Sequence, residues 1–162
     1  MIRITKQTDY GIVLLTHLAT HRETQYNAPD LATETQLPAP TVSKILKLLA
    51  REGLLASHRG VKGGYTLARE PRDISMAQII AVLEGPIAMT ECEDEHGDCV
   101  HEPTCHVRSN WHRINVAVRD ALAGISLAEM ALPTPSSKLV MLGGGLRQDE
   151  RSEAHPTPPV AG

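Results

Sequence analysis

A chain of 162 residues with 41% hydrophobic residues can form one domain with an appendage, and its 2% aromatic content requires an aliphatic core. With three Tyr, one Trp and no Phe, it cannot build the aromatic platform that usually grips single-stranded nucleic acid. The net charge of −3 conceals an asymmetry: residues 1–70 carry nine Lys and Arg against six Asp and Glu, whereas residues 71–132 carry four against ten. This distribution fits a phosphate-facing module joined to an acidic one.

The sequence contains no apolar run long enough to span a bilayer and no signal-peptide core at its start. We therefore expect a cytoplasmic protein. In that reducing compartment the three cysteines are not expected to form structural disulfides. No phosphate-cradling loop, nucleophile elbow or Cys-x-x-Cys motif is present, so enzymatic activity is not expected.

Two helices are predicted at the start of the chain. The first spans residues 2–21, and its apolar face is assigned to Tyr10, Ile12, Val13, Leu14 and Leu18. The second is capped by Asn27, has Pro29 in its first turn and is broken at residues 36–38.

A third, strongly amphipathic helix is predicted from Pro40 to Glu52, with Gly53 as its stop. Its inward positions are Val42, Ile45, Leu46 and Leu49. Its outward positions are Thr41, Ser43, Lys44, Lys47 and Arg51. Two short strands follow, at residues 54–58 and 65–69, and the three glycines in the intervening segment 59–64 permit the positive-φ turn of a hairpin.

Helix, short helix, turn, helix and hairpin is the element order of a winged helix-turn-helix. The third helix fits the major groove, where Thr41, Ser43 and Lys44 can reach base edges. Lys47 and Arg51 are expected to contact phosphates, and Arg59 and Lys62 at the hairpin tip can enter a groove. Alternatively, these basic residues face solvent and the glycines form an ordinary turn, but the ordered combination favours DNA binding.

The second half of the chain begins with a helix whose capping box is Ser75 and Gln78 and which ends near Glu84. A loop over residues 89–105 leads to a longer helix over 107–123, and Ser126 with Glu129 indicates one further turn. Three regions result: a winged helix-turn-helix over 1–70, a linker helix, cysteine loop and long helix over 71–132, and a disordered tail over 133–162. The expected fold class is mainly α, with a small β-hairpin wing.

The loop carries Cys92, Cys99 and Cys105, followed directly by His106. Zinc could take the three thiolates plus His106, His101 or His96. An iron–sulfur cluster, 2Fe–2S or 4Fe–4S, could take the three thiolates and a fourth ligand that is often not cysteine. The spacings are wider than those of most zinc motifs, which favours a cluster. A third possibility is three free cysteines or a thiol redox switch.

The residues of the start (2–11), the wing (59–67) and the three-cysteine loop with its Trp-bearing helix resemble the Rrf2 family over about residues 2–132. That family includes iron–sulfur regulators of the IscR, NsrR and RirA types and regulators of SUF assembly operons. The resemblance implies a homodimer on a palindromic double-stranded DNA site, with the helix over 107–123 packing against its mate. It implies that Arg59 lies at a groove-reading position of the wing.

The same resemblance implies that Cys92, Cys99 and Cys105 hold an iron–sulfur cluster. The fourth ligand it implies is Asp9 of the partner subunit, with His106 as the second choice. The function it implies is a cluster-dependent transcriptional regulator, a repressor of a SUF iron–sulfur assembly operon. The alternatives are a nitric-oxide or redox sensor of the same family and a zinc-stabilised DNA-binding protein.

Overall fold

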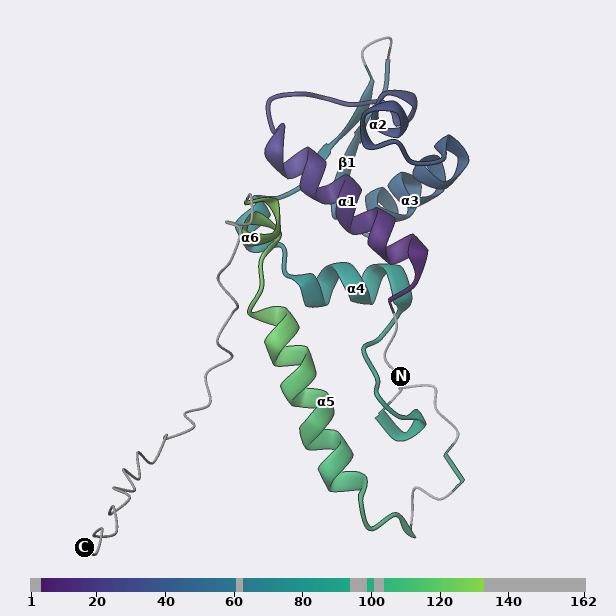
Figure 1. The fold of residues 1–162 in the computed structure, drawn as a ribbon, viewed down its shortest axis with the longest axis vertical. Helices are drawn as coiled ribbons and strands as arrows, with labels where there is room; N and C mark the ends of the chain where they lie inside the picture. The colour runs from purple at the N-terminus through teal and green to yellow at the C-terminus, as the bar shows by residue number, and fades with distance from the viewer. Residues whose placement is uncertain (1–3, 61–62, 94–98, 101–103, 133–162) are drawn as a thin grey trace, which may run out of the picture.

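The structure is a computed structural model that describes residues 4–60, 63–93, 99–100 and 104–132. The expected disordered tail, residues 133–162, lies outside that range. The helices within it are α1 (Lys6–Thr20), α2 (Ala28–Thr35), α3 (Ala39–Arg51), α4 (Met76–Glu84), α5 (Arg108–Ala123) and α6 (Leu127–Ala131). The hairpin consists of β1 (Leu55–His58) and β2 (Gly64–Leu67), and the short 3-10 turns are η1 (Pro71–Asp73) and η2 (Glu91–Glu93). The mainly helical architecture with a small hairpin is confirmed (Figure 1).

The start of α1 is fixed by a joint with the end of α4. Thr5 caps the helix by accepting a hydrogen bond from the Thr8 amide at 3.3 Å, so α1 begins at Lys6, later than expected. The Thr5 amide in turn donates to Glu84 Oε1 at 2.7 Å. Hydrogen bonds from the Thr8 side chain and the Thr5 amide hold the pKa of Glu84 below its usual range. A carboxylate at the N-terminus of α1 also interacts favourably with the helix dipole.

The buried face of α1 is rotated from the predicted one. Leu15, which we did not assign to the core, is 0% exposed, whereas Val13, which we did assign, is 38% exposed. The buried positions of α1 share one helical face: Thr8, Gly11, Leu14, Leu15, Leu18 and Ala19. Val13 falls outside that arc, so its assignment was wrong.

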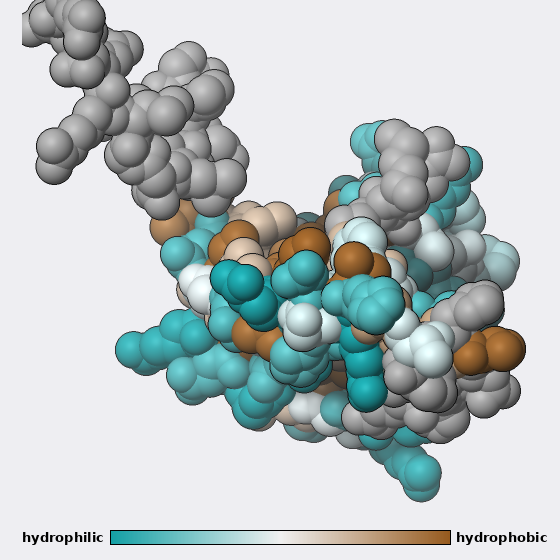
Figure 2. Space-filling view, turned by 90° about the horizontal axis from the view of Figure 1, so that it is seen from below, coloured by the Kyte–Doolittle hydropathy of each residue, from teal (hydrophilic) through white to brown (hydrophobic). Residues whose placement is uncertain are grey.

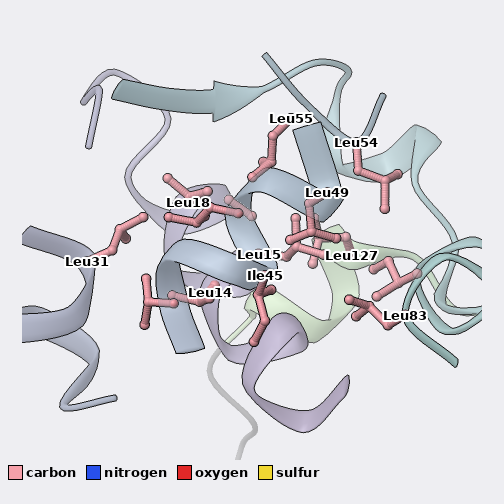
Figure 3. Packing of buried hydrophobic residues seen from close by; sticks show 14 of the residues in the cluster. Leu14, Leu15, Leu18, Leu31, Ile45, Leu49, Leu54, Leu55, Leu83 and Leu127 are labelled. Atoms are coloured by element: carbon pink, nitrogen blue, oxygen red, sulfur yellow. The ribbon is translucent and has the colours of Figure 1, made fainter. Parts of the chain in front are cut away.

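The core is aliphatic, as the composition requires, and Tyr26 is its one aromatic member among the buried residues of the described chain. Figure 3 shows a cluster that extends from Leu31 of α2 through leucines of α1, α3 and β1 to Leu127 of α6 and Leu83 of α4. Gly11 allows α4 to approach α1, because a Cβ at that position would lie 2.5 Å from Leu83 Cδ1. A side chain at this position would therefore require the Leu83 side chain to shift.

The chain returns to the helical body after α5 through α6. Leu127 donates its amide to the Ile74 carbonyl at 2.8 Å, and Met76 donates to the Ile125 carbonyl at 2.8 Å. The capping box predicted for Ser75 and Gln78 is present, and the further turn indicated by Ser126 and Glu129 also begins with a capping box. These contacts fix α6 beside η1 and α1.

Helix α5 extends away from the helical body, at the end opposite to the wing (Figure 1). In Figure 2, which looks at the molecule from that end, hydrophobic residues are interspersed among hydrophilic ones. Periodicity predicts an apolar stripe on α5 formed by Trp111, Ile114, Val118, Ala121 and Leu122. It is only partly covered: Trp111, Val118 and Leu122 are half-buried, while Ile114 and Ala121 are exposed. No helix in the described residues is long and apolar enough to cross a membrane.

Candidate nucleic-acid interface and cysteine loop

Helices α2 and α3 are joined by the tight turn that the sequence predicts at residues 36–38. Gln36 adopts a left-handed conformation with φ of 56°, and the Leu37 amide donates to the Ala32 carbonyl at 3.1 Å. Pro38 and Pro40 then begin α3. On the other side of α2, Glu34 Oε2 lies 2.9 Å from His17 Nε2, which joins α2 to α1.

Helix α3 presents opposite faces to the core and to solvent, as predicted. Its four inward residues, Val42, Ile45, Leu46 and Leu49, are fully buried. Lys44 and Lys47 are exposed, and Thr41 and Ser43 are half-buried at its N-terminal half. Within the described residues neither lysine forms an ion pair, whereas Arg51 pairs with Glu52 at 2.8 Å. The two lysines are therefore the free cations of this face.

The hairpin pairs Leu55 with Leu67 and His58 with Gly64 in antiparallel register. Arg59 and Gly60 are exposed at its tip, where Gly60 has a φ of 118° and accepts a hydrogen bond from the Gly63 amide at 2.8 Å. His58 Nε2 lies 3.0 Å from Thr66 Oγ1 across the strands. Lys62, the second cation predicted for the tip, lies outside the described residues.

Two of the three wing glycines have a role other than the expected one. Gly63 and Gly64 do not have positive φ. A Cβ at Gly63 would lie 2.5 Å from the His58 carbonyl oxygen, and one at Gly64 would lie 2.5 Å from the Tyr26 carbonyl oxygen. Close approach of backbone, rather than turn conformation, therefore requires these two glycines.

The wing is fastened to the helices by contacts that the sequence analysis missed. The Tyr65 amide donates to the Tyr26 carbonyl at 2.7 Å, and the Tyr26 amide donates to the Tyr65 carbonyl at 3.3 Å. Tyr26 directly precedes Asn27, which caps α2. A second tie joins Arg22 to Glu70, and this hydrogen bond holds the pKa of Glu70 below its usual range. The sequence gives one sign of the first of these contacts: each of the two segments that it joins carries a tyrosine, Tyr26 or Tyr65.

The cysteines lie at the far end of the molecule from the wing. Cys92 belongs to η2, and Cys99 and Cys105 lie in the connection to α5. All three are free thiols and partly exposed. The Sγ of Cys92 lies 3.1 Å from Thr90 Oγ1. Asp9 is exposed in the first turn of α1, and His106 is exposed just before α5.

The part of the chain that the structure describes contains no group of three His, Cys, Asp or Glu side chains close enough to hold a metal ion. The structure thus does not bring Cys92, Cys99 and Cys105 together with Asp9 or His106. His96 and His101, the other two zinc candidates, lie outside the described residues.

The Rrf2 family model, described as "Iron-dependent Transcriptional regulator", matches residues 4–132. The chain belongs to the Rrf2 family. Like its relatives, it is a transcriptional regulator and not an enzyme. The Rrf2 match spans both the winged half and the cysteine half of the chain.

Two curated Rrf2 relatives illustrate the range of similarity. The transcriptional regulator CymR of Bacillus subtilis is 34% identical over 132 residues, which is 80% of this chain and 90% of CymR. The regulator NsrR of Geobacillus kaustophilus is 29% identical over 131 residues, 80% of this chain and 89% of NsrR.

Solved structures of Rrf2 proteins match the fold. CymR of B. subtilis, described as its global cysteine regulator, has a TM-score of 0.64 at 30% identity, covering 81% of this chain and 97% of that one. IscR of T. potens has a TM-score of 0.61 at 30% identity, covering 80% and 85%. These likenesses confirm the winged helix-turn-helix fold predicted from the sequence.

The donor chemistry of the Rrf2 chain fits a thiolate-bound metal group. Three thiols within one loop, none of them in a disulfide, are the ligands that iron–sulfur clusters and zinc prefer, and the three residues are partly exposed. Convergence of the three sulfurs requires the loop to close around the group.

Proposed function

We propose that this Rrf2 protein is an iron–sulfur-cluster-dependent regulator that represses a SUF-type iron–sulfur assembly operon. The observation that carries the proposal is the division of the molecule: free lysines on α3 and an exposed wing at one end, and three free thiols next to α5 at the other. The first end has the chemistry for phosphates and base edges. The second has the chemistry for a metal cluster that responds to iron supply or oxidants.

At the DNA end, α3 enters the major groove with Thr41, Ser43 and Lys44 toward base edges and Lys47 toward a phosphate. The exposure of both lysines and their freedom from ion pairs among the described residues support this assignment. Arg59 and Lys62 are the wing residues assigned to a groove. Arg51, also expected at a phosphate, first has to leave its ion pair with Glu52.

A second copy of the chain covers the exposed edge of the α5 stripe. Val107 at the start of α5, Ile114 on the helix and Ile125 just after its end are 49%, 43% and 39% exposed, and burying them between two copies is favourable. The two-fold symmetry of such a dimer matches a palindromic operator.

The dimer is tested with two matched substitutions. Ile114→Asp should convert the dimer to a monomer in sedimentation and weaken operator binding. Val116→Asp is the control, because Val116 is similarly exposed, at 38%, but lies on the opposite side of α5. Dissociation by Val116→Asp and not by Ile114→Asp would place the dimer contact elsewhere.

The cluster is held by Cys92, Cys99 and Cys105, with Asp9 of the partner subunit as the fourth ligand and His106 as the second choice. Anaerobic purification should give a brown protein, and Cys92→Ser should remove its visible absorbance. Asp9→Ala should shorten the lifetime of the cluster, whereas Asp30→Ala should not. Asp30 is a fair control because both aspartates are exposed in the first turn of a helix.

The deciding experiment titrates holo and apo protein against the promoter of the assembly operon. Repression by the holo form predicts tighter binding when the cluster is present. Equal affinities would refute cluster-dependent regulation. Loss of DNA binding on nitric-oxide treatment alone would instead indicate a nitric-oxide sensor.

A second candidate is a cluster-free regulator of the CymR kind, favoured by the 34% identity with CymR of B. subtilis. In this case the anaerobic protein is colourless, and oxidation of its free thiols changes DNA affinity directly. Stoichiometric zinc in a colourless protein would indicate the zinc-stabilised alternative.

A further inference from the structure

Asn115 is the only residue of α5 that is buried, at 1% exposed, in a helix whose other described residues are exposed or half-buried. A buried amide is costly unless its polar atoms are hydrogen-bonded. Both bonds of Asn115 leave the helix. Its Oδ1 accepts from the Met89 amide at 3.2 Å, and its Nδ2 donates to Glu93 Oε2 at 3.4 Å.

The segment held in this way, residues 89–93, contains the first cysteine and is here named the Cys92 arm. The carboxylate of Glu93, at the end of the arm, is 9% exposed and also lies 3.1 Å from Nδ1 of His112, one helical turn before Asn115. Inside the arm, the Glu93 amide donates to the Thr90 carbonyl at 3.0 Å. One side chain of α5 therefore fastens both ends of the segment that carries Cys92.

We propose that Asn115 is a positioning residue that clamps the Cys92 arm to α5, so that a displacement of the Cys92 sulfur is transmitted to that helix. The amide of Asn115 supplies both an acceptor for a backbone N–H and a donor to a carboxylate. The clamp itself depends on neither a metal nor a partner. Its regulatory consequence rests on the proposed function, in which Cys92 is a ligand and α5 contacts the second copy.

The clamp is tested by hydrogen exchange of peptides covering residues 87–93 in the metal-free protein. Asn115→Leu keeps the side-chain size but removes both bonds, and should accelerate exchange at Met89 about fivefold or more. Asn115→Asp should do the same, because it places two carboxylates against each other. Glu93→Gln should keep most of the protection, because its amide oxygen still accepts from Asn115.

The double variant Asn115→Asp with Glu93→Gln reverses the donor and the acceptor and should restore protection. A merely space-filling role for Asn115 predicts no such rescue. Failure of the double variant to exchange more slowly than Asn115→Asp, or unchanged exchange in Asn115→Leu, overturns the clamp. Circular dichroism of each variant checks that α5 is retained.

The consequence is measured as the ratio of holo to apo affinity for the operator. Asn115→Leu should bring this ratio close to one while the affinity of the apo form is kept. A wild-type ratio retained in Asn115→Leu overturns the transmission. If the wild-type protein binds no cluster but the variants show the expected differences in hydrogen exchange, the proposed function is overturned and the clamp is supported.

Discussion

Gly64→Ala tests how the wing is fastened to the helices. The added Cβ would lie 2.5 Å from the Tyr26 carbonyl oxygen, 2.7 Å from its carbon and 3.1 Å from the Asn27 nitrogen. All three are backbone atoms, which cannot rotate away as a side chain can. Relief therefore requires β2 to move from the segment at Tyr26, which stretches the two hydrogen bonds between Tyr26 and Tyr65.

The expected cost follows from these contacts. Overpacking of a well-packed site costs about 1–3 kcal/mol, and each weakened neutral hydrogen bond costs up to about 1 kcal/mol. We expect Gly64→Ala to lower the free energy of unfolding by about 2–4 kcal/mol. The matched control is Gly53→Ala: Gly53 has a φ of 75° but has open space around its Cβ position, so its cost is backbone strain of about 1 kcal/mol.

Urea denaturation gives the change in unfolding free energy for both variants, provided that the dependence of this free energy on urea concentration is unchanged. DNA affinity gives a second readout, because a displaced wing would lose the groove contact proposed for it. Gly64→Ala should be the more damaging variant in both assays, although Gly53 has the less favourable backbone conformation. The reasoning is refuted if Gly64→Ala destabilises the protein no more than Gly53→Ala does.

Three further predictions concern charge, pH and core register. Lys47→Ala should weaken specific and non-specific DNA binding alike and reduce the slope of log affinity against log salt by about one; an unchanged slope means no phosphate contact. Because the pKa of Glu84 is lowered on folding, its stabilisation is complete above the unfolded carboxyl range and is lost as pH falls through the folded pKa. In Glu84→Gln the free energy of unfolding, measured by denaturation, should therefore fall less steeply as the pH is lowered. The same pH dependence in the variant and the wild type would contradict this. Leu15→Ala should cost about 2–5 kcal/mol and Val13→Ala less than about 1 kcal/mol in the same assay; the reverse order would restore the predicted face of α1.

Features set by neighbouring residues were predictable from the sequence. The capping box of Ser75 with Gln78 and the further turn that begins at Ser126 with Glu129 depend on a spacing of three residues and occur where expected. The inward face of α3 was also predicted in full, because its apolar and basic residues separate cleanly at helical spacing.

Features that depend on distant residues were not predictable. The requirement for Gly64 comes from the backbone of Tyr26, and the buried position of Gly11 comes from Leu83. In α1, apolar residues occur on most of the circumference, so periodicity alone did not distinguish Leu15 from Val13.

Helix α5 shows how one polar residue decides the role of an apolar stripe. Periodicity identified Trp111, Ile114, Val118 and Leu122 but did not indicate which of them face the body. Asn115 lies beside this stripe, and its hydrogen bonds to the Cys92 arm, together with the packing of Leu122 against the core, define the rotation of α5 about its axis. This rotation turns the part of the stripe next to Asn115 toward the body and leaves Ile114 exposed. The contacts that hold the Cys92 arm thus also contribute to which edge of α5 is exposed, and in the proposed dimer that edge faces the second copy.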